Sequence, residues 1–245
     1  RILLATGVYP PAIGGPAKQV YDLAHALATA GHTVSVLTFG HERSIEKRDD
    51  IMVYTMRRNI AIFGKFLKYF HLRAMLRVIV SAGIPDIVQV NSVRFFGYVV
   101  GRYFKARGVP TIIKYAGDFV FETINRDTLK VIEIADVFTI SLKARWLRWL
   151  EQRILKTFDR IWAQSAYQRN VLVQHLGIPE SSVVVMPNYI DIKPYREGAT
   201  LLRPDMPDMK PRPIILSVSR LVPWKNIEAQ MHVAAKKQEF EKAKE

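Results

Sequence analysis

Hydrophobic runs of strand length alternate along most of this chain with longer stretches of helical periodicity. Short apolar runs predict strands at residues 2–5, 33–38, 52–56, 86–90, 111–115, 160–164 and 183–186, the last of them buried. Between them, apolar residues at spacings of three and four predict helices at residues 17–30, 63–81, 96–107 and 165–176, and two helical stretches within residues 129–156. This alternation is typical of βαβ units, so it predicts an α/β domain whose parallel sheet is covered by helices.

The pattern changes after Asn188, where prolines become frequent. Proline lacks the backbone N–H and resists both helix and central strand, so residues 193–212 are predicted to be an interdomain linker. Residues 1–192 then form the first domain. Residues 213–245 hold one strand, a turn and a helix, which are too few to bury a core of their own. We therefore expect them to be the start of a second, truncated domain.

Composition excludes several classes of protein. The chain has 245 residues, 49% of them hydrophobic, and no cysteine, so disulfide scaffolds, thiolate metal sites and cysteine nucleophiles are excluded. No signal-peptide pattern opens the sequence, and its apolar runs fall short of the roughly 20 residues that a spanning helix needs. The sequence thus favours a cytoplasmic protein with a sizeable core.

The charge balance predicts an anionic partner, because 36 Lys and Arg against 22 Asp and Glu give a net charge of +14. Residues 51–85 contain no acidic side chain, and residues 142–153 combine basic side chains with Trp146 and Trp149. Such segments suit an amphipathic helix on the inner face of an anionic membrane. They equally suit helices packed on a sheet with solvated basic rims. Because no nucleic-acid-binding motif occurs, a membrane surface is favoured over nucleic acid.

Two features favour a phosphate ligand. Arg220 and Lys225 lie in the turn that follows the apolar run 213–219, where two fixed positive charges suit a diphosphate. Gly14 and Gly15 lie between the first strand and the first helix, with Pro16 at the start of that helix. Glycine lets a ligand approach the backbone, and a helix N-terminus favours anions. The glycine pair is also compatible with a simple tight turn.

Four segments in this order resemble the N-terminal half of a family 4 glycosyltransferase of the two-domain GT-B type. They are Pro10–Gly15, Leu23–Leu37, Met186–Asp191 and Ser219–Asn226. The resemblance implies a Rossmann-like acceptor domain over residues 1–192 and a second Rossmann-like domain that holds the donor. It also implies sugar transfer with retention at the anomeric carbon, from a UDP- or GDP-linked nucleotide-diphospho-sugar to a cell-envelope, lipid-linked or polysaccharide acceptor.

The same resemblance assigns roles to residues. Gly14, Gly15, Arg220 and Lys225 would bind the donor diphosphate, whereas Asn188 and Asp191 would shape the crossing between domains. The acidic motif with which relatives hold the donor sugar would lie beyond Glu245, so this chain by itself is expected to be inactive.

Asp118 is the candidate catalytic residue. It follows the predicted strand 111–115 at the strand's carboxyl end, where α/β proteins place their ligands. Relatives carry a histidine near this position, but this chain has Ala116 and Gly117 there. Asp118 is therefore expected to contact a sugar hydroxyl or the acceptor, although a carboxylate that merely caps the loop fits the sequence equally well.

No metal or cofactor is expected, because the histidines lack ligand spacing and no Asp-x-Asp motif occurs. An alternative function uses the basic surface alone. In that interpretation the chain is a non-catalytic Rossmann-like module that binds an anionic membrane surface or polymer, and it would have no need of Arg220 and Lys225.

Overall fold

The computed structural model describes residues 1–58, 64–118, 120–121, 123–124, 141–189, 192 and 196. The chain divides into two compact units, one formed by Arg1–Val120 with Phe138–Asn188 and the other by Phe121–Val137 with Tyr189–Glu245. The elements below all belong to the first unit. The predicted segment 213–245, with Arg220 and Lys225, lies outside the described residues, as do Asp191 and nearly all of the predicted linker.

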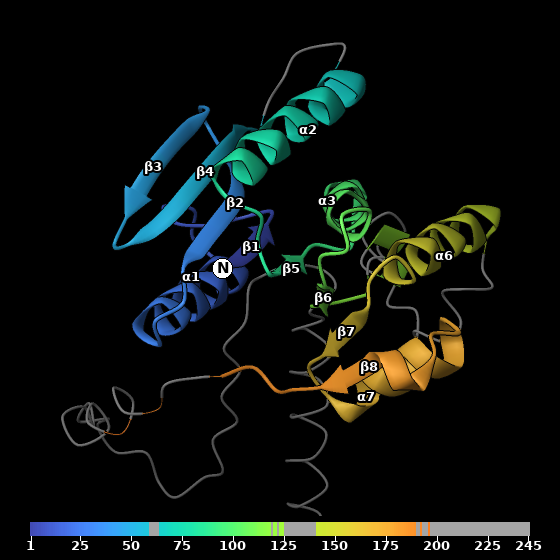
Figure 1. The fold of residues 1–245 in the computed structure, drawn as a ribbon. Coiled ribbons are helices and arrows are strands. Elements are labelled where there is room, and N and C mark those ends of the chain that lie inside the picture. Colours follow the sequence, from blue (N-terminus) through green and yellow to red (C-terminus); the bar gives the residue numbers. More distant parts are fainter. Residues whose placement is uncertain are drawn as a thin grey trace, which may run out of the picture. The chain divides into compact units, whose positions relative to one another are not determined.

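The described residues of the first unit form a mostly parallel sheet with the strand order β3-β4-β2-β1-β5-β6-β7-β8, shown in Figure 1. All pairs are parallel except β3 with β4. The strands are β1 (Ile2–Thr6), β2 (Val34–Gly40), β3 (Ser44–Arg48), β4 (Ile51–Arg57), β5 (Ile87–Asn91), β6 (Thr111–Tyr115), β7 (Arg160–Ala163) and β8 (Val183–Val185).

Helices follow five of these strands, β1, β4, β5, β6 and β7, whereas the parallel strands β2 and β4 are joined through β3. These helices are α1 (Gly15–Thr29), α2 (Gly64–Ala82), α3 (Phe95–Lys105), α6 (Leu142–Leu155) and α7 (Ala166–Asn170), the last followed by a π-helical turn at Val171–His175 and a 3-10 turn at Glu180–Ser182. The predicted α/β class is confirmed. In the part of the chain that is described, no helix is long and apolar enough to cross a membrane.

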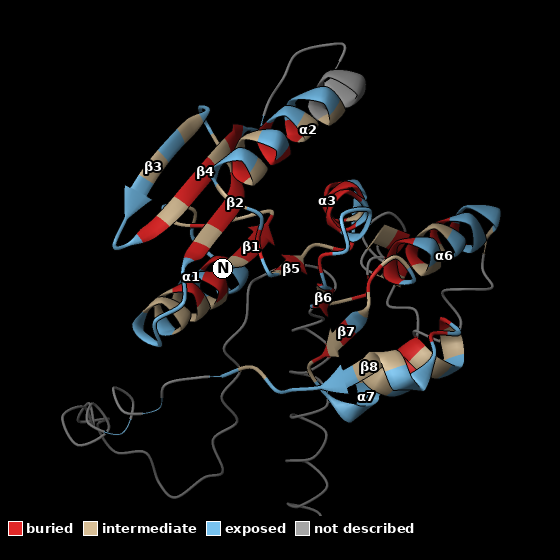
Figure 2. Cartoon of the chain, viewed as in Figure 1, coloured by how far each residue is buried: buried red, intermediate tan, exposed pale blue. Residues whose placement is uncertain are grey.

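Alternating side chains of the central strands build two cores, one on each face of the sheet. Leu4 of β1 packs in a cluster with Val20 and Ala24 of α1. Its neighbour Leu3 belongs to a larger cluster on the opposite face, where α2, α3 and α6 pack. Figure 2 shows buried and exposed surfaces on α2, whereas α3 is mostly buried. Since side chains alternate along a strand, apolar residues at successive positions of β1 bury both faces.

Three elements differ from the prediction. β3 was not expected, because Ser44–Arg48 is largely polar; it pairs as an exposed edge strand through a hairpin turn at Asp49 and Asp50, whose φ angles of 45° and 64° suit such turns. β8 forms as predicted but is not buried, since it lies at the sheet edge. Ser165 caps α7 as expected, accepting from the Gln168 N–H at 3.2 Å, but the helix becomes π-helical at Val171.

Candidate functional site

The candidate site lies at the carboxyl edge of the sheet, where β1, β5, β6 and β7 end together. The loop after β1 leads into α1, whose N-terminus faces this edge. α1 begins at Gly15, with Gly14 as its N-cap, no side-chain cap and no acidic residue in its first turn. The first N–H groups of a helix have no intrahelical partner, so this end of α1 presents donors and the positive end of the helix dipole.

The two glycines of this loop differ in what they require. Gly14 has a φ of +152°, a conformation that other residues rarely adopt. Gly15 has no positive φ, and a Cβ atom built on it would have no heavy atom within 4 Å beyond its chain neighbours. The described residues therefore leave free the space that a side chain at Gly15 would fill. A ligand can approach the helix N-terminus there.

The loop itself is tied to the body of the unit. The Arg48 guanidinium donates to the carbonyl oxygen of Pro10 at 3.1 Å, and that of Arg58 donates to the carbonyl oxygen of Gly7 at 3.4 Å. Tyr9 is buried, and burial raises the pKa of its phenol to about 12, so it stays neutral. These contacts hold the glycine loop in place before any ligand binds.

Lys114 of β6 is the unexpected charged residue of this edge. Its side chain lies on the α1 side of the sheet and the residue is only 5% exposed. The ammonium donates to the Gln19 Oε1 atom at 3.0 Å and the Asn188 Oδ1 atom at 2.7 Å. It also lies 4.3 Å from the ring centroid of Trp162. Burial lowers the pKa of Lys114, as expected for an ammonium with neutral neighbours.

A chain of neutral amides continues from Lys114. The Asn188 amide donates to the Gln164 side chain, whose own amide donates to the carbonyl oxygen of Tyr115 at 3.2 Å. In the described part of the chain no carboxylate pairs with Lys114. One signal in the sequence marked this residue, a lysine inside the otherwise apolar strand Thr111–Tyr115, but nothing in the sequence identified its partners.

The structure places the predicted site residues as follows. Gly14 and Gly15 lie at the N-terminus of α1, and Asp118 is a buried residue just beyond the carboxyl end of β6. The hydrogen bond that joins β6 to α1 comes from Lys114. Asn188 is the last residue of the first unit. Among the described residues there is no group of three or more side chains suited to hold a metal ion.

Comparisons with known proteins agree with this architecture. The family model described as Glycosyltransferase Family 4 matches residues 13–193. A sequence search of curated proteins finds no match. The solved structures similar to this chain include the lipopolysaccharide outer core galactosyltransferase WaaB in its apo form, with 15% identity and a TM-score of 0.52 over 79% of this chain and 47% of that chain.

Two further structures have similar scores. A sucrose-phosphate synthase from Thermosynechococcus elongatus has 14% identity and a TM-score of 0.52, covering 83% of this chain and 98% of that chain. A UDP-forming α,α-trehalose-phosphate synthase from Burkholderia vietnamiensis has 12% identity and a TM-score of 0.50, covering 82% and 51%. At such identities the likeness shows the fold. The present chain spans about half the length of the galactosyltransferase and of the trehalose-phosphate synthase.

Proposed function

Because this chain belongs to glycosyltransferase family 4, we propose that its full-length protein transfers a sugar from a nucleotide-diphospho-sugar to a glycan or lipid-linked acceptor. The donor is UDP- or GDP-linked, and transfer retains the anomeric configuration. The acceptor is a cell-envelope glycan, a lipid-linked sugar or a polysaccharide. The galactosyltransferase among the similar structures is named for such an acceptor, the outer core of lipopolysaccharide.

The observation that carries this proposal is the open N-terminus of α1 at Gly15. Donor phosphates that approach this end meet free backbone N–H groups and the positive end of the helix dipole. The absence of a side chain at Gly15 lets them come close. Arg220 and Lys225 would neutralise the rest of the diphosphate charge, so the leaving nucleotide needs no metal ion. Asp118 would accept a hydrogen bond from a sugar or acceptor hydroxyl.

The first test substitutes Gly15 by valine and measures sugar transfer from UDP- and GDP-sugars by the full-length protein, with a membrane extract as the source of acceptor. We expect transfer to fall at least tenfold because the valine occupies the space that the diphosphate needs. The control is Ala26→Val, the same size of side chain at an exposed position of the same helix. Equal transfer by the Gly15 variant and the control would contradict the proposal.

The second test concerns the residues assigned by resemblance. Arg220→Ala and Lys225→Ala should each abolish transfer while the protein remains folded by circular dichroism. Asp118→Asn should reduce transfer if its carboxylate contacts a hydroxyl, and full activity would remove it from the site. Transfer should continue in the presence of a chelator of divalent ions, whereas its loss would refute the metal-independent scheme.

A membrane contact is supported by α6. Leu142, Trp146 and Trp149 form one stripe at helical spacing, and they are 81%, 57% and 48% exposed. The opposite side of α6 packs through Leu147 and Leu155, so the stripe is not needed for the core. Tryptophan and leucine flanked by exposed basic residues suit the interface of an anionic bilayer. In α2, by contrast, Phe70 is exposed, but the following apolar residues Leu72, Met75, Leu76 and Ile79 are buried in the core, which favours a packing role for that part of the helix.

The membrane contact is tested by sedimentation with anionic vesicles. Trp146→Ala with Trp149→Ala should weaken binding at least fivefold, whereas Tyr167→Ala, which removes an exposed aromatic ring from α7, should not. The same exposed stripe is the observation that favours the alternative function, a non-catalytic module that binds an anionic surface. Vesicle binding without any donor binding by the full-length protein would favour that second function.

A further inference from the structure

A basic cavity opens at the amino edge of the sheet, away from the candidate site. It lies between the C-terminal ends of α3 and α6, and its volume is about 490 Å³. Four basic side chains line it, Arg102 and Lys105 of α3 with Arg153 and Lys156 at the end of α6, together with Tyr98 and Thr157. None of the described residues that line it is acidic. A cavity of this volume falls within the range of small-molecule sites.

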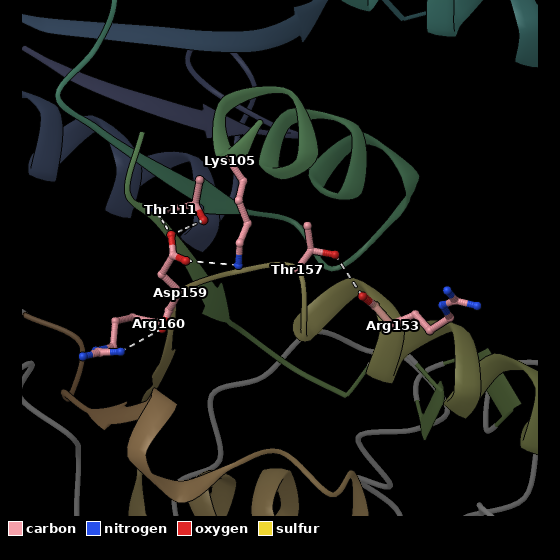
Figure 3. Close-up of polar contacts among 6 residues, drawn as sticks. All are labelled: Lys105, Thr111, Arg153, Thr157, Asp159 and Arg160. Atoms are coloured by element: carbon pink, nitrogen blue, oxygen red, sulfur yellow. Dashed lines mark hydrogen bonds and ion pairs between the residues drawn. The ribbon is translucent and has the colours of Figure 1, made fainter. Parts of the chain in front are cut away.

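Among the described residues, Asp159 is the acidic partner of this cluster, and it is already engaged. One of its carboxylate oxygens accepts from both the N–H and the hydroxyl of Thr111 at 2.9 Å, and the other lies 3.1 Å from the Lys105 ammonium. Figure 3 shows these contacts beside Arg153 and Thr157. Burial raises the pKa of the Asp159 carboxyl, but the Thr111 hydrogen bonds and Lys105 outweigh burial and hold that pKa below its usual value. Within the described residues, Arg102, Arg153 and Lys156 have no carboxylate at ion-pair distance.

The basic side chains of the cavity are not used to cap the C-terminal ends of α3 and α6. The last carbonyls of α6 accept from backbone N–H groups of Lys156 and Thr157, and the Thr157 hydroxyl donates to the Arg153 carbonyl at 2.9 Å. At the end of α3, the Arg102 and Lys105 carbonyls accept from the N–H groups of Ala106 and Gly108. The chain's own donors thus satisfy these carbonyls, so the basic side chains are not needed for capping. The Arg153 guanidinium lies 5.0 Å from the ring centroid of Trp149, a contact that leaves its N–H donors able to bind a ligand.

The local charge gives the class of ligand. Four basic side chains contribute four positive charges. Asp159 offsets one of them, and the two helix C-termini, each with roughly half a negative charge, offset about one more, so about two positive charges remain. The Arg102 guanidinium lies 5.8 Å from the ring centroid of Tyr98 and also lines a neighbouring cavity of about 220 Å³ with Arg73 and Arg107. Two positive charges with planar guanidinium donors match a phosphate monoester or a diphosphate.

We propose that the cavity between α3 and α6 binds a phosphorylated ligand, either a soluble phosphate or diphosphate or the phosphomonoester headgroup of a lipid. Arg102 and Arg153 hold the phosphate oxygens from two helices, and Lys156 adds charge at the rim. The site is separate from the glycine loop and does not depend on the proposed transferase activity.

Two probes distinguish the sources of phosphate. Inorganic pyrophosphate is titrated calorimetrically into the protein, and sedimentation compares vesicles containing phosphatidic acid with phosphatidylserine vesicles of equal surface charge. The test variant is Arg102→Gln with Arg153→Gln. The control is Arg160→Gln with Lys47→Gln, which removes the same charge from exposed positions outside the cavity. Figure 3 shows Arg160 extending away from Lys105 and Thr157.

We expect at least tenfold weaker binding in the test variant and less than twofold change in the control. Pyrophosphate binding with this pattern assigns the cavity to a soluble ligand, and a preference for phosphatidic acid with the same pattern assigns it to a lipid phosphomonoester. The proposal is overturned if neither probe binds, or if the two variants bind alike, because a diffuse basic surface would then explain the affinity. Circular dichroism confirms that both variants are folded.

Discussion

The two edges of the sheet hold a charged side chain differently: half-exposed Asp159 at the amino edge and buried Lys114 at the carboxyl edge. At the amino edge the Asp159 carboxylate accepts two hydrogen bonds from Thr111 and pairs with Lys105. At the carboxyl edge the Lys114 ammonium is more deeply buried, yet its partners among the described residues are the neutral side chains of Gln19 and Asn188 and the ring of Trp162. A compensated charge favours the folded state, whereas an uncompensated one costs stability. The contacts of Asp159 therefore stabilise the fold, whereas a buried charge without an ionic partner, such as Lys114, is typical of a functional site.

The largest effect is expected at Asp159. Replacing it with alanine leaves the buried N–H and hydroxyl of Thr111 without their acceptor, so the free energy of unfolding should fall by about 2–3 kcal/mol. Urea denaturation measures this difference. The control Asp22→Asn breaks an exposed pair within α1 and should cost less than about 0.5 kcal/mol. If the two variants lose the same free energy of unfolding, Asp159 contributes no more than an exposed ion pair, and the proposed difference between the two edges is wrong.

Acid should remove the contribution of Asp159. The folded pKa of this carboxyl is lowered, so its stabilising effect is complete above the unfolded value of about 3.9 and disappears as pH falls through the lower folded value. The difference in unfolding free energy between wild type and Asp159→Asn should thus shrink below about pH 4. Urea midpoints at a series of pH values measure it. A difference that stays constant into strong acid would show that the charge of Asp159 is not what stabilises the edge.

Lys114 should behave in the opposite way. Its folded pKa lies below the usual lysine value of 10.5, so between these two pKa values the unfolded chain binds more protons and stability rises with pH. Lys114→Met removes the buried charge but also two hydrogen bonds to amide oxygens. We therefore expect the free energy of unfolding at neutral pH to change by less than about 1 kcal/mol, and the alkaline rise to vanish. A loss comparable to that of Asp159→Ala would make Lys114 a structural residue like Asp159.

The sequence predicted what depends on local periodicity. The apolar run Thr111–Tyr115 gave β6 with its observed bounds, and Ser165 was identified as a helix cap. The polar edge strand β3 was missed because its stability comes from pairing with β4 and not from apolar alternation. The roles of Arg220 and Lys225 remain predictions.

The missed parts of the sites depend on contacts between distant residues. The partners of Lys114 come from Gln19 and Asn188, and no periodic pattern joins these positions. The basic cavity likewise gathers the ends of α3 and α6, whereas the composition gave only a net charge of +14. Such clusters of side chains can be identified only in the folded structure, where the order of the strands brings the ends of α3 and α6 together.

The smallest effect on stability is expected at Gly15. A Cβ atom there meets open space, so Gly15→Ala should gain helix propensity and lose a little freedom beside Pro16, for a net change within about 0.5 kcal/mol. Gly14→Ala should cost more, because its φ of +152° strains any residue with a side chain. Urea denaturation of the two variants measures this contrast. If Gly15→Ala destabilises the protein as much as Gly14→Ala, then the fold of the loop requires glycine at position 15. The open space beside Gly15 would then be no evidence for a ligand site at the carboxyl edge.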